Sequence, residues 1–169
     1  MPEIILDACV LSNFASAGAM GLIEKLYGGR AFVPEFVVVE VLRGVQSGNV
    51  ALAAVPEAIR AGWLKETGPM SREERELFET LSRSSGLGEA AGLAPAAKRG
   101  WLFASDDRLA RTEAARLGIR LTGTLGLLAK AVRSGGCDLG AADACLAKMA
   151  EAGFYSPVRS IREVLGDSP

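Results

Sequence analysis

The chain contains no histidine and only three cysteines among its 169 residues. Zinc sites built from cysteine and histidine are therefore excluded, and Cys9, Cys137 and Cys145 form no Cys-x-x-Cys pair. We expect the three thiols to be free and buried, as in proteins of a reducing cytosol. Without histidine, the chemistry falls to oxygen ligands, which suit hard cations such as Mg²⁺ or Mn²⁺.

Long apolar runs and a strong net charge are also missing. No stretch approaches the roughly 20 apolar residues that cross a bilayer. Acidic Glu3 and Asp7 follow the start at once, so we expect no signal peptide and a cytoplasmic location without membrane contact. The net charge of −1 provides no general basic field for coating nucleic acid, although a nuclease with a local basic rim stays possible.

The rest of the composition is that of an ordinary globular protein, with 49% hydrophobic and 23% charged residues. Short apolar runs alternate with segments of helical periodicity, and no linker divides them. This pattern predicts one α/β domain over residues 1–169, built as a three-layer α/β/α sandwich around a mainly parallel sheet.

The expected strands are short and alternate with helices. We place strands at residues 3–7, 31–33, 63–66, 101–104 and 119–121. Helices are expected at residues 11–26, 36–45, 50–61, 71–83, 87–98, 107–117, 124–132, 139–152 and 157–165. The β-branched residues 37–39 leave a strand open as an alternative there. Pro56 either kinks its helix or starts a new one, and Ser156 would cap the last helix.

Two of the apolar runs end on aspartate. Ile4–Leu6 leads directly into Asp7, and a second run leads through Ser105 into Asp106 and Asp107. Aspartate is depleted within strands, and open α/β sheets bind ligands beyond the carboxyl ends of their strands. Each aspartate could also cap the following helix, although one cap does not need two adjacent carboxylates. We favour a functional role for Asp7 and for at least one of the pair.

Two glutamates stand among small or apolar residues. Glu40 lies within Val37–Leu42, where an unpaired carboxylate would be costly to bury. Its side chain either points to solvent or faces a polar site, and we favour the second interpretation. Glu89 lies at the expected start of a helix, where a carboxylate is stabilising in any case. Taken alone, this helix-start role explains Glu89.

Other charged residues have simpler explanations. Arg108 and Arg111 either pair with Glu113 and the aspartates or contact a phosphate, and both options remain open. We expect Asp138 and Asp143 to be solvated. Residues 72–83 are expected to form a charged, solvated helix face with internal ion pairs, among them Glu74.

Four short motifs, in this order along the chain, resemble those of the PIN-domain nucleases. They are Asp7-x-x-x-Leu11-x-x-Phe14, Val33-Pro34 followed by Glu40-Val41, Gly88-Glu89-Ala90, and Ser105-Asp106-Asp107 followed by Ala110-Arg111. The third motif carries glutamate where aspartate is commoner, as in one prokaryotic subgroup of the family. Residues 122–128 and 153–155 also resemble that subgroup, so the similarity covers nearly the whole chain.

The resemblance implies an α/β/α sandwich whose distant acidic residues converge at one end of the sheet. It also implies metal-dependent cleavage of phosphodiesters, usually in RNA. Such proteins often act as the toxin of a toxin–antitoxin pair and commonly form homodimers. We therefore expect an endoribonuclease that uses Mg²⁺ or Mn²⁺, with a possible cognate antitoxin as partner.

The resemblance also implies roles for individual residues. Asp7, Glu40, Glu89 and Asp107 would hold one or two cations, with Asp106 assisting. Ser105 would orient a water, a carboxylate or a phosphate, and Arg111 would contact a phosphate. Lys98 or Arg99 would extend the basic rim of the site.

Two other functions remain open. Glu89 adds a methylene relative to aspartate, and Pro95 falls inside its helix, so a catalytically weak module that binds RNA or protein is the main alternative. A phosphatase with Asp7 as nucleophile, similar to haloacid dehalogenases, is the other. Those enzymes usually carry a second aspartate two residues later, where this chain has Cys9.

Overall fold

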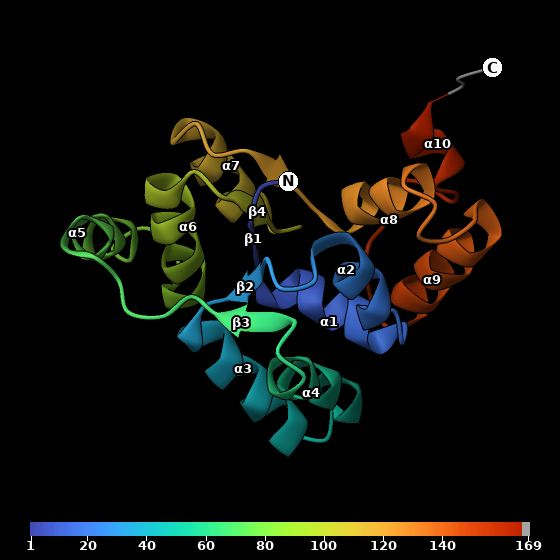
Figure 1. Cartoon of the computed structure of the whole chain (residues 1–169), viewed down its shortest axis with the longest axis horizontal. Helices are drawn as coiled ribbons and strands as arrows, with labels where there is room; N and C mark the ends of the chain where they lie inside the picture. Colours follow the sequence, from blue (N-terminus) through green and yellow to red (C-terminus); the bar gives the residue numbers. More distant parts are fainter. Residues whose placement is uncertain (167–169) are drawn as a thin grey trace.

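Five short strands form one parallel sheet in the computed structural model, which describes residues 1–166 (Figure 1). Across the sheet the order is β3-β2-β1-β4-β5, and every neighbouring pair is parallel. The strands are β1 (Ile4–Leu6), β2 (Ala31–Val33), β3 (Leu64–Glu66), β4 (Leu102–Ala104) and β5 (Leu121–Thr122). The expected α/β fold with a central parallel sheet is confirmed.

Helices connect and cover these strands. They are α1 (Ala8–Ser16), α2 (Met20–Tyr27), α3 (Glu35–Gln46), the 3-10 helix η1 (Val50–Ala53), α4 (Ala54–Arg60), α5 (Arg72–Leu81), α6 (Leu87–Arg99), α7 (Arg108–Arg116), α8 (Thr124–Arg133), α9 (Leu139–Glu151) and α10 (Arg162–Leu165). Residues 37–39 are therefore helical. Within the described part of the chain, no helix is both long and apolar enough to cross a membrane.

Three helices differ from the expectation. The single helix predicted over residues 11–26 is two helices, because the chain turns at Gly18 with a φ of 64°. The helix predicted at 50–61 begins with η1, and Pro56 lies in the first turn of α4, where no N–H bond is lost. The helix predicted from Pro157 begins only at Arg162, and the Ser156 hydroxyl instead bonds to the backbone of Val158.

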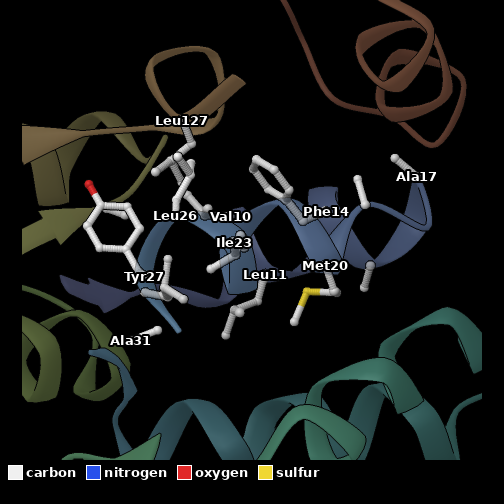
Figure 2. Close-up of a cluster of buried hydrophobic side chains, with 14 of the residues drawn as sticks. Val10, Leu11, Phe14, Ala17, Met20, Ile23, Leu26, Tyr27, Ala31 and Leu127 are labelled. Atoms are coloured by element: carbon white, nitrogen blue, oxygen red, sulfur yellow. The ribbon is translucent and has the colours of Figure 1, made fainter. Parts of the chain in front are cut away.

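Side chains of the sheet alternate between two apolar clusters, one on each face. Ile4 and Leu6 point into the larger cluster, together with residues of α1, α2, α3, α4, α8 and α9. Figure 2 shows part of this cluster, with Phe14 of α1 and Ile23 of α2 among its members. Ile5 points into the smaller cluster with residues of α6 and α7. Helices therefore cover both faces, as a parallel sheet requires (Figure 1).

The strand order places a ligand crevice at a definite point. From β1 the chain moves outward to β2 and β3, and it then returns to β4 and β5 on the other side of β1. Open α/β sheets bind ligands at the carboxyl ends of the two strands where the direction reverses. Here these strands are β1 and β4, and they lead into Asp7 and Ser105.

Helix α6 packs unusually close to the sheet because its buried face is made of small residues. A Cβ at Gly92 would lie 2.7 Å from Cε2 of Phe103 and 3.6 Å from Cγ2 of Ile5. Pro95 is buried within the same helix, which continues past it to Arg99. This close packing fixes the position of the helix start, where Glu89 lies.

Gly92→Ala is expected to destabilise the protein by about 1–3 kcal/mol, because the added methyl group overpacks the contact with Phe103. Urea unfolding measures the change. Gly21→Ala in α2 is the control, since nothing lies within 4 Å of its Cβ position. We expect this second variant to be neutral or slightly more stable. Equal effects of the two substitutions would show that α6 does not make the close contact.

Candidate functional site

Asp7 is held by groups from two strand ends and is only 8% exposed. Its Oδ1 accepts a hydrogen bond from the backbone N–H of Ala8 at 2.8 Å, which caps α1. Its Oδ2 accepts a hydrogen bond from the hydroxyl of Ser105 at 2.7 Å. The capping role considered from the sequence is therefore present, but it uses only one of the two oxygens. The other oxygen faces the end of β4.

Ser105 is fully buried and bridges the two aspartate motifs. Its Oγ donates to Asp7 and accepts a hydrogen bond from the backbone N–H of Asp107 at 3.1 Å. Of the roles expected for Ser105, the structure places it to orient a carboxylate. Its complete burial leaves it without access to a phosphate in solution.

Asp106 is tied to two other elements through both of its oxygens. Oδ1 accepts from the backbone N–H of Thr124 at 2.9 Å, and Oδ2 accepts from the Thr124 hydroxyl and from Nδ2 of Asn13. A Cβ at Gly123 would lie 2.5 Å from Oδ1, so the missing side chain makes room for this carboxylate. Asp106 thus joins the end of β4 to α1 and α8.

Asp107 caps α7 through a single oxygen. Its Oδ1 accepts from the backbone N–H of Ala110 at 2.8 Å, and within residues 1–166 its Oδ2 makes no hydrogen bond. The residue borders a hollow of about 500 Å³ that is also lined by Cys9, Asn13 and Asp106. One oxygen of Asp107 thus remains free of hydrogen bonds beside this hollow.

Glu40 reaches the same end of the sheet from α3. It borders an adjoining hollow of about 370 Å³, which shares Cys9 with the hollow next to Asp107. Its Oε2 lies 3.7 Å from the Cβ position of Gly88, at the start of α6. Partial burial raises the pKa of Glu40 above its usual range, and the charges of Asp7 and Glu89 raise this pKa further. The charges of both Asp7 and Glu89 therefore reach Glu40.

Glu89 has the helix-start role that its sequence position suggested. Its Oε2 accepts a hydrogen bond from the backbone N–H of Gly86, which caps α6. The same carboxylate contributes to the raised pKa of Glu40. Glu89 is thus both a cap and a neighbour of the other acidic residues. We call Asp7, Glu40, Glu89, Asp106 and Asp107 the acidic site.

The acidic site suits a hard cation in its ligands and its charge. All five side chains offer carboxylate oxygens, and the ion pairs within residues 1–166 involve none of the five. However, no three or more Cys, Asp and Glu side chains in this part of the chain lie close enough together to hold a metal ion. Asp7 belongs to two sets of residues. Hydrogen bonds through Ser105 connect it to Asp107, and its charge acts on Glu40.

Arg111 supports the backbone beside the acidic site. Its Nη1 donates to the carbonyl oxygens of Ser105 at 2.8 Å and Thr122 at 2.9 Å, which joins the ends of β4 and β5. The pairing with Glu113 considered from the sequence does not form, because Glu113 pairs with Arg116. A phosphate contact of Arg111 stays a prediction.

The expected basic rim at Lys98 and Arg99 is wrong. These residues end α6, about 15 Å of helix away from Glu89 at its start. Arg99 pairs with Glu74 and donates to the carbonyl oxygen of Thr67 at 2.9 Å. Glu74 is itself buried, which corrects its expected place on a solvated helix face. This pair holds α5 against α6.

Three residues without an assigned role in the sequence analysis help to build the site. Cys9 donates to Oδ2 of Asp7 at 3.4 Å and accepts from the backbone N–H of Asp106 at 3.3 Å. Burial and the charge of Asp7 raise the pKa of this thiol to about 11, so it stays protonated. Asn13 and Thr124 hold Asp106. Only Thr124 had a sequence signal, since it lies in the run 122–128.

The cysteines and the two aspartates near the C-terminal end, Asp138 and Asp143, have contacts that the sequence did not fully predict. All three thiols are free but only partly buried. Asp143 was expected to be solvated, but its carboxylate accepts hydrogen bonds from the Ser160 hydroxyl at 2.9 Å and the Ile161 N–H at 2.7 Å. Asp138 caps α9. Neither aspartate belongs to the acidic site.

Comparison with known proteins identifies the family of the chain. A protein-family model described as a PIN domain matches residues 3–168. The chain belongs to the PIN domain family. This assignment confirms the resemblance carried by the four motifs, and no curated protein matches the sequence. PIN domains are generally nucleases and typically use divalent metals.

The shifted pKa of Glu40 predicts a pH-dependent gain in stability for Glu40→Gln. Because this pKa is raised in the folded protein, Glu40 stabilises the fold below its unfolded pKa of about 4.3. That stabilisation is lost as the pH rises through the folded pKa. In EDTA, the free energy of unfolding of the wild-type PIN domain should therefore fall relative to that of Glu40→Gln between pH 4 and pH 7.

Urea unfolding across this pH range measures the difference. Glu24→Gln, on the exposed face of α2, is the matched control, and we expect no comparable gain there. If Glu40→Gln were no more stable than the wild-type protein at pH 7, the destabilisation of the charged Glu40 by burial and by Asp7 and Glu89 would be refuted.

Proposed function

We propose that this PIN domain is a metal-dependent endoribonuclease. The observation that carries the proposal is the gathering of Asp7, Glu40 and Glu89 at one end of the sheet, where the charges of Asp7 and Glu89 reach Glu40 and no basic side chain of residues 1–166 forms an ion pair with any of the three. Carboxylates in this relation are stabilised by a bound cation. Their oxygens match the preference of Mg²⁺ and Mn²⁺. The position at the reversal of strand order further supports an active site.

Each residue of the acidic site has a proposed role. Asp7, Glu40, Glu89 and Asp107 hold one or two cations, and Asp106 assists by fixing the loop that carries Asp107. Ser105 keeps Asp7 turned toward the site. Glu40 is on a long, exposed side chain, so rotation about its bonds would let it approach a cation. The chemistry that the cation supplies when bound is Lewis acidity toward water and toward the phosphodiester.

The substrate and biological role are proposed in line with the family. RNA phosphodiesters are cleaved to products that carry a 5′-phosphate, and the protein acts in the cytoplasm as a toxin whose cognate antitoxin blocks the acidic site. Residues 1–169 act as one domain, because a single sheet supports both apolar clusters. Neighbouring genes would identify an antitoxin.

A homodimer is also proposed, and helices rich in small residues are candidates for its interface because they can pack closely. The small residues of α6 are buried inside the chain and are not available to a second copy. On α9, in contrast, Ala141, Ala144 and Ala147 are exposed. Sedimentation at micromolar concentration measures this association, and a monomer under these conditions would count against it.

The nuclease proposal predicts cleavage that needs both the metal and Asp7. With Mn²⁺, we expect the wild-type protein to cleave RNA, and EDTA should abolish this cleavage. Asp7→Asn should reduce the rate by about 100-fold or more, because the neutral amide holds the cation less strongly than the carboxylate does. Incubation of single-stranded and structured RNAs, followed by separation of the products, measures the effect.

Asp138→Asn is the matched control, because Asp138 caps α9 through a similar hydrogen bond, 2.7 Å from its Oδ1 to the N–H of Ala141. This variant should cleave like the wild-type protein. Mn²⁺ should also raise the melting temperature of the wild-type protein more than that of Asp7→Asn. Cleavage that is equal with Mn²⁺, with EDTA and with Asp7→Asn would defeat the proposal.

A binding module without catalysis is the second candidate. It is favoured by the absence of a gathered set of three metal-ligating side chains within residues 1–166. RNA binding that weakens steeply with salt, together with no cleavage in Mn²⁺, would support this function over the nuclease. Metal-dependent turnover would eliminate it.

A further inference from the structure

Tyr155 is the most exposed aromatic residue in the described part of the chain, and it lies in the loop after α9. Its exposed fraction is 87%, against 42% for Phe36, the other exposed aromatic residue of residues 1–166. Phe36 stacks on Phe78 with the ring centroids 5.7 Å apart, whereas Tyr155 stacks on no ring within the same residues. Packing within the chain therefore does not account for this side chain.

The loop holds Tyr155 in place from both sides. The backbone N–H of Phe154 donates to the carbonyl of Met149 at 2.9 Å, and the half-buried Phe154 ring packs against the larger apolar cluster. On the other side, the Ser156 hydroxyl donates to the carbonyl of Val158 at 2.6 Å. A ring on such an anchored loop loses little conformational freedom when a ligand covers it.

Tyr155 stands between two hollows that meet at the acidic site. One is the 500 Å³ hollow next to Asp107, and the other, of about 440 Å³, is lined by Arg111 and Thr122. Asp106 and Tyr155 border both of them. A polymer that passes the acidic site through either hollow therefore also passes this ring.

The charges around the two hollows favour an uncharged contact. The first hollow is lined by two aspartates and by no lysine or arginine. Arg111 is the only basic residue that lines the second hollow, and its Nη1 already donates to two carbonyl oxygens. Binding of a polyanion here therefore gains little from basic side chains. Stacking of a base on an aromatic ring adds affinity without adding charge.

We propose that Tyr155 is a stacking platform for an unpaired nucleobase of the RNA, next to the phosphate at the acidic site. This inference rests on the proposed nuclease function and deepens it. Bases inside a duplex are already stacked and cannot lie flat on the ring. The platform therefore selects single-stranded RNA over duplex RNA.

Binding measured without cleavage tests the platform directly. Asp7→Asn protein in Mn²⁺ is titrated into a fluorescent single-stranded oligoribonucleotide and into a matched duplex, and anisotropy gives the two affinities. Adding Tyr155→Ala should weaken single-strand binding by about 5-fold or more and leave duplex binding unchanged. Tyr155→Phe keeps the ring and should bind within about 2-fold of the parent protein. Phe36→Ala is the control for an exposed aromatic residue elsewhere.

Several results would overturn the platform. These are unchanged single-strand binding by Tyr155→Ala, an equal loss on the duplex, a loss with Tyr155→Phe as large as that with alanine, or no binding by any protein. Thermal unfolding checks that the exposed substitutions leave the fold intact. Cleavage by the wild-type chain is assayed separately. Its absence would refute the nuclease function alone, because the binding comparison still decides whether Tyr155 stacks a base.

Discussion

One buried hydroxyl group links the two strand ends on which the acidic site is built. Ser105 donates to Asp7 after β1 and accepts from the N–H of Asp107 after β4, so the two motifs are held in a fixed relation. The pairing of β1 with β4 brings Asp7 and Ser105 together from positions 98 apart in the chain. Burial makes the link firm, since an unsatisfied partner in this environment costs about 1–3 kcal/mol. The orientation of Asp7 depends on this contact.

A second set of hydrogen bonds stabilises the same region, and the charged groups that make them are themselves hydrogen-bonded. Both oxygens of Asp106 accept hydrogen bonds from Thr124 and Asn13, and Nη1 of Arg111 donates to two backbone carbonyls. These groups fix the loop after β4 against α1, α8 and β5. Asp7, Glu40 and Glu89 are different, because burial and the charges of Asp7 and Glu89 raise the pKa of Glu40, and none of the three is in an ion pair within residues 1–166. The hydrogen-bonded loop after β4 therefore lies beside carboxylates that disfavour the charged form of Glu40. A bound cation would offset this unfavourable interaction.

Local patterns were sufficient for the strands, most helices and the choice of Asp7, Glu40 and the Asp106–Asp107 pair as candidates, whereas Glu89 became a candidate only through the family resemblance. Three apolar residues before Asp7 predicted a strand and its end, and the alternation of short strands with helices predicted a parallel sheet. The motif order led to the PIN family. The split between α1 and α2 was missed because Gly18 interrupts a hydrophobic period that both helices continue. The late helix was placed too early because Ser156 and Pro157 look like a helix start, whereas the Ser156 hydroxyl bonds to Val158.

The sequence by itself determined which residue types are available: no histidine, carboxylates after two strands, and a glutamate on each of two helices. Only the tertiary structure decided which of them meet. Helix α6 runs away from the site, so Arg99 pairs with Glu74 instead of forming a rim, and Tyr155 comes to stand beside Asp106. The reason is physical: strand order and helix direction join partners about 100 residues apart, and no short-range period in a sequence encodes such contacts.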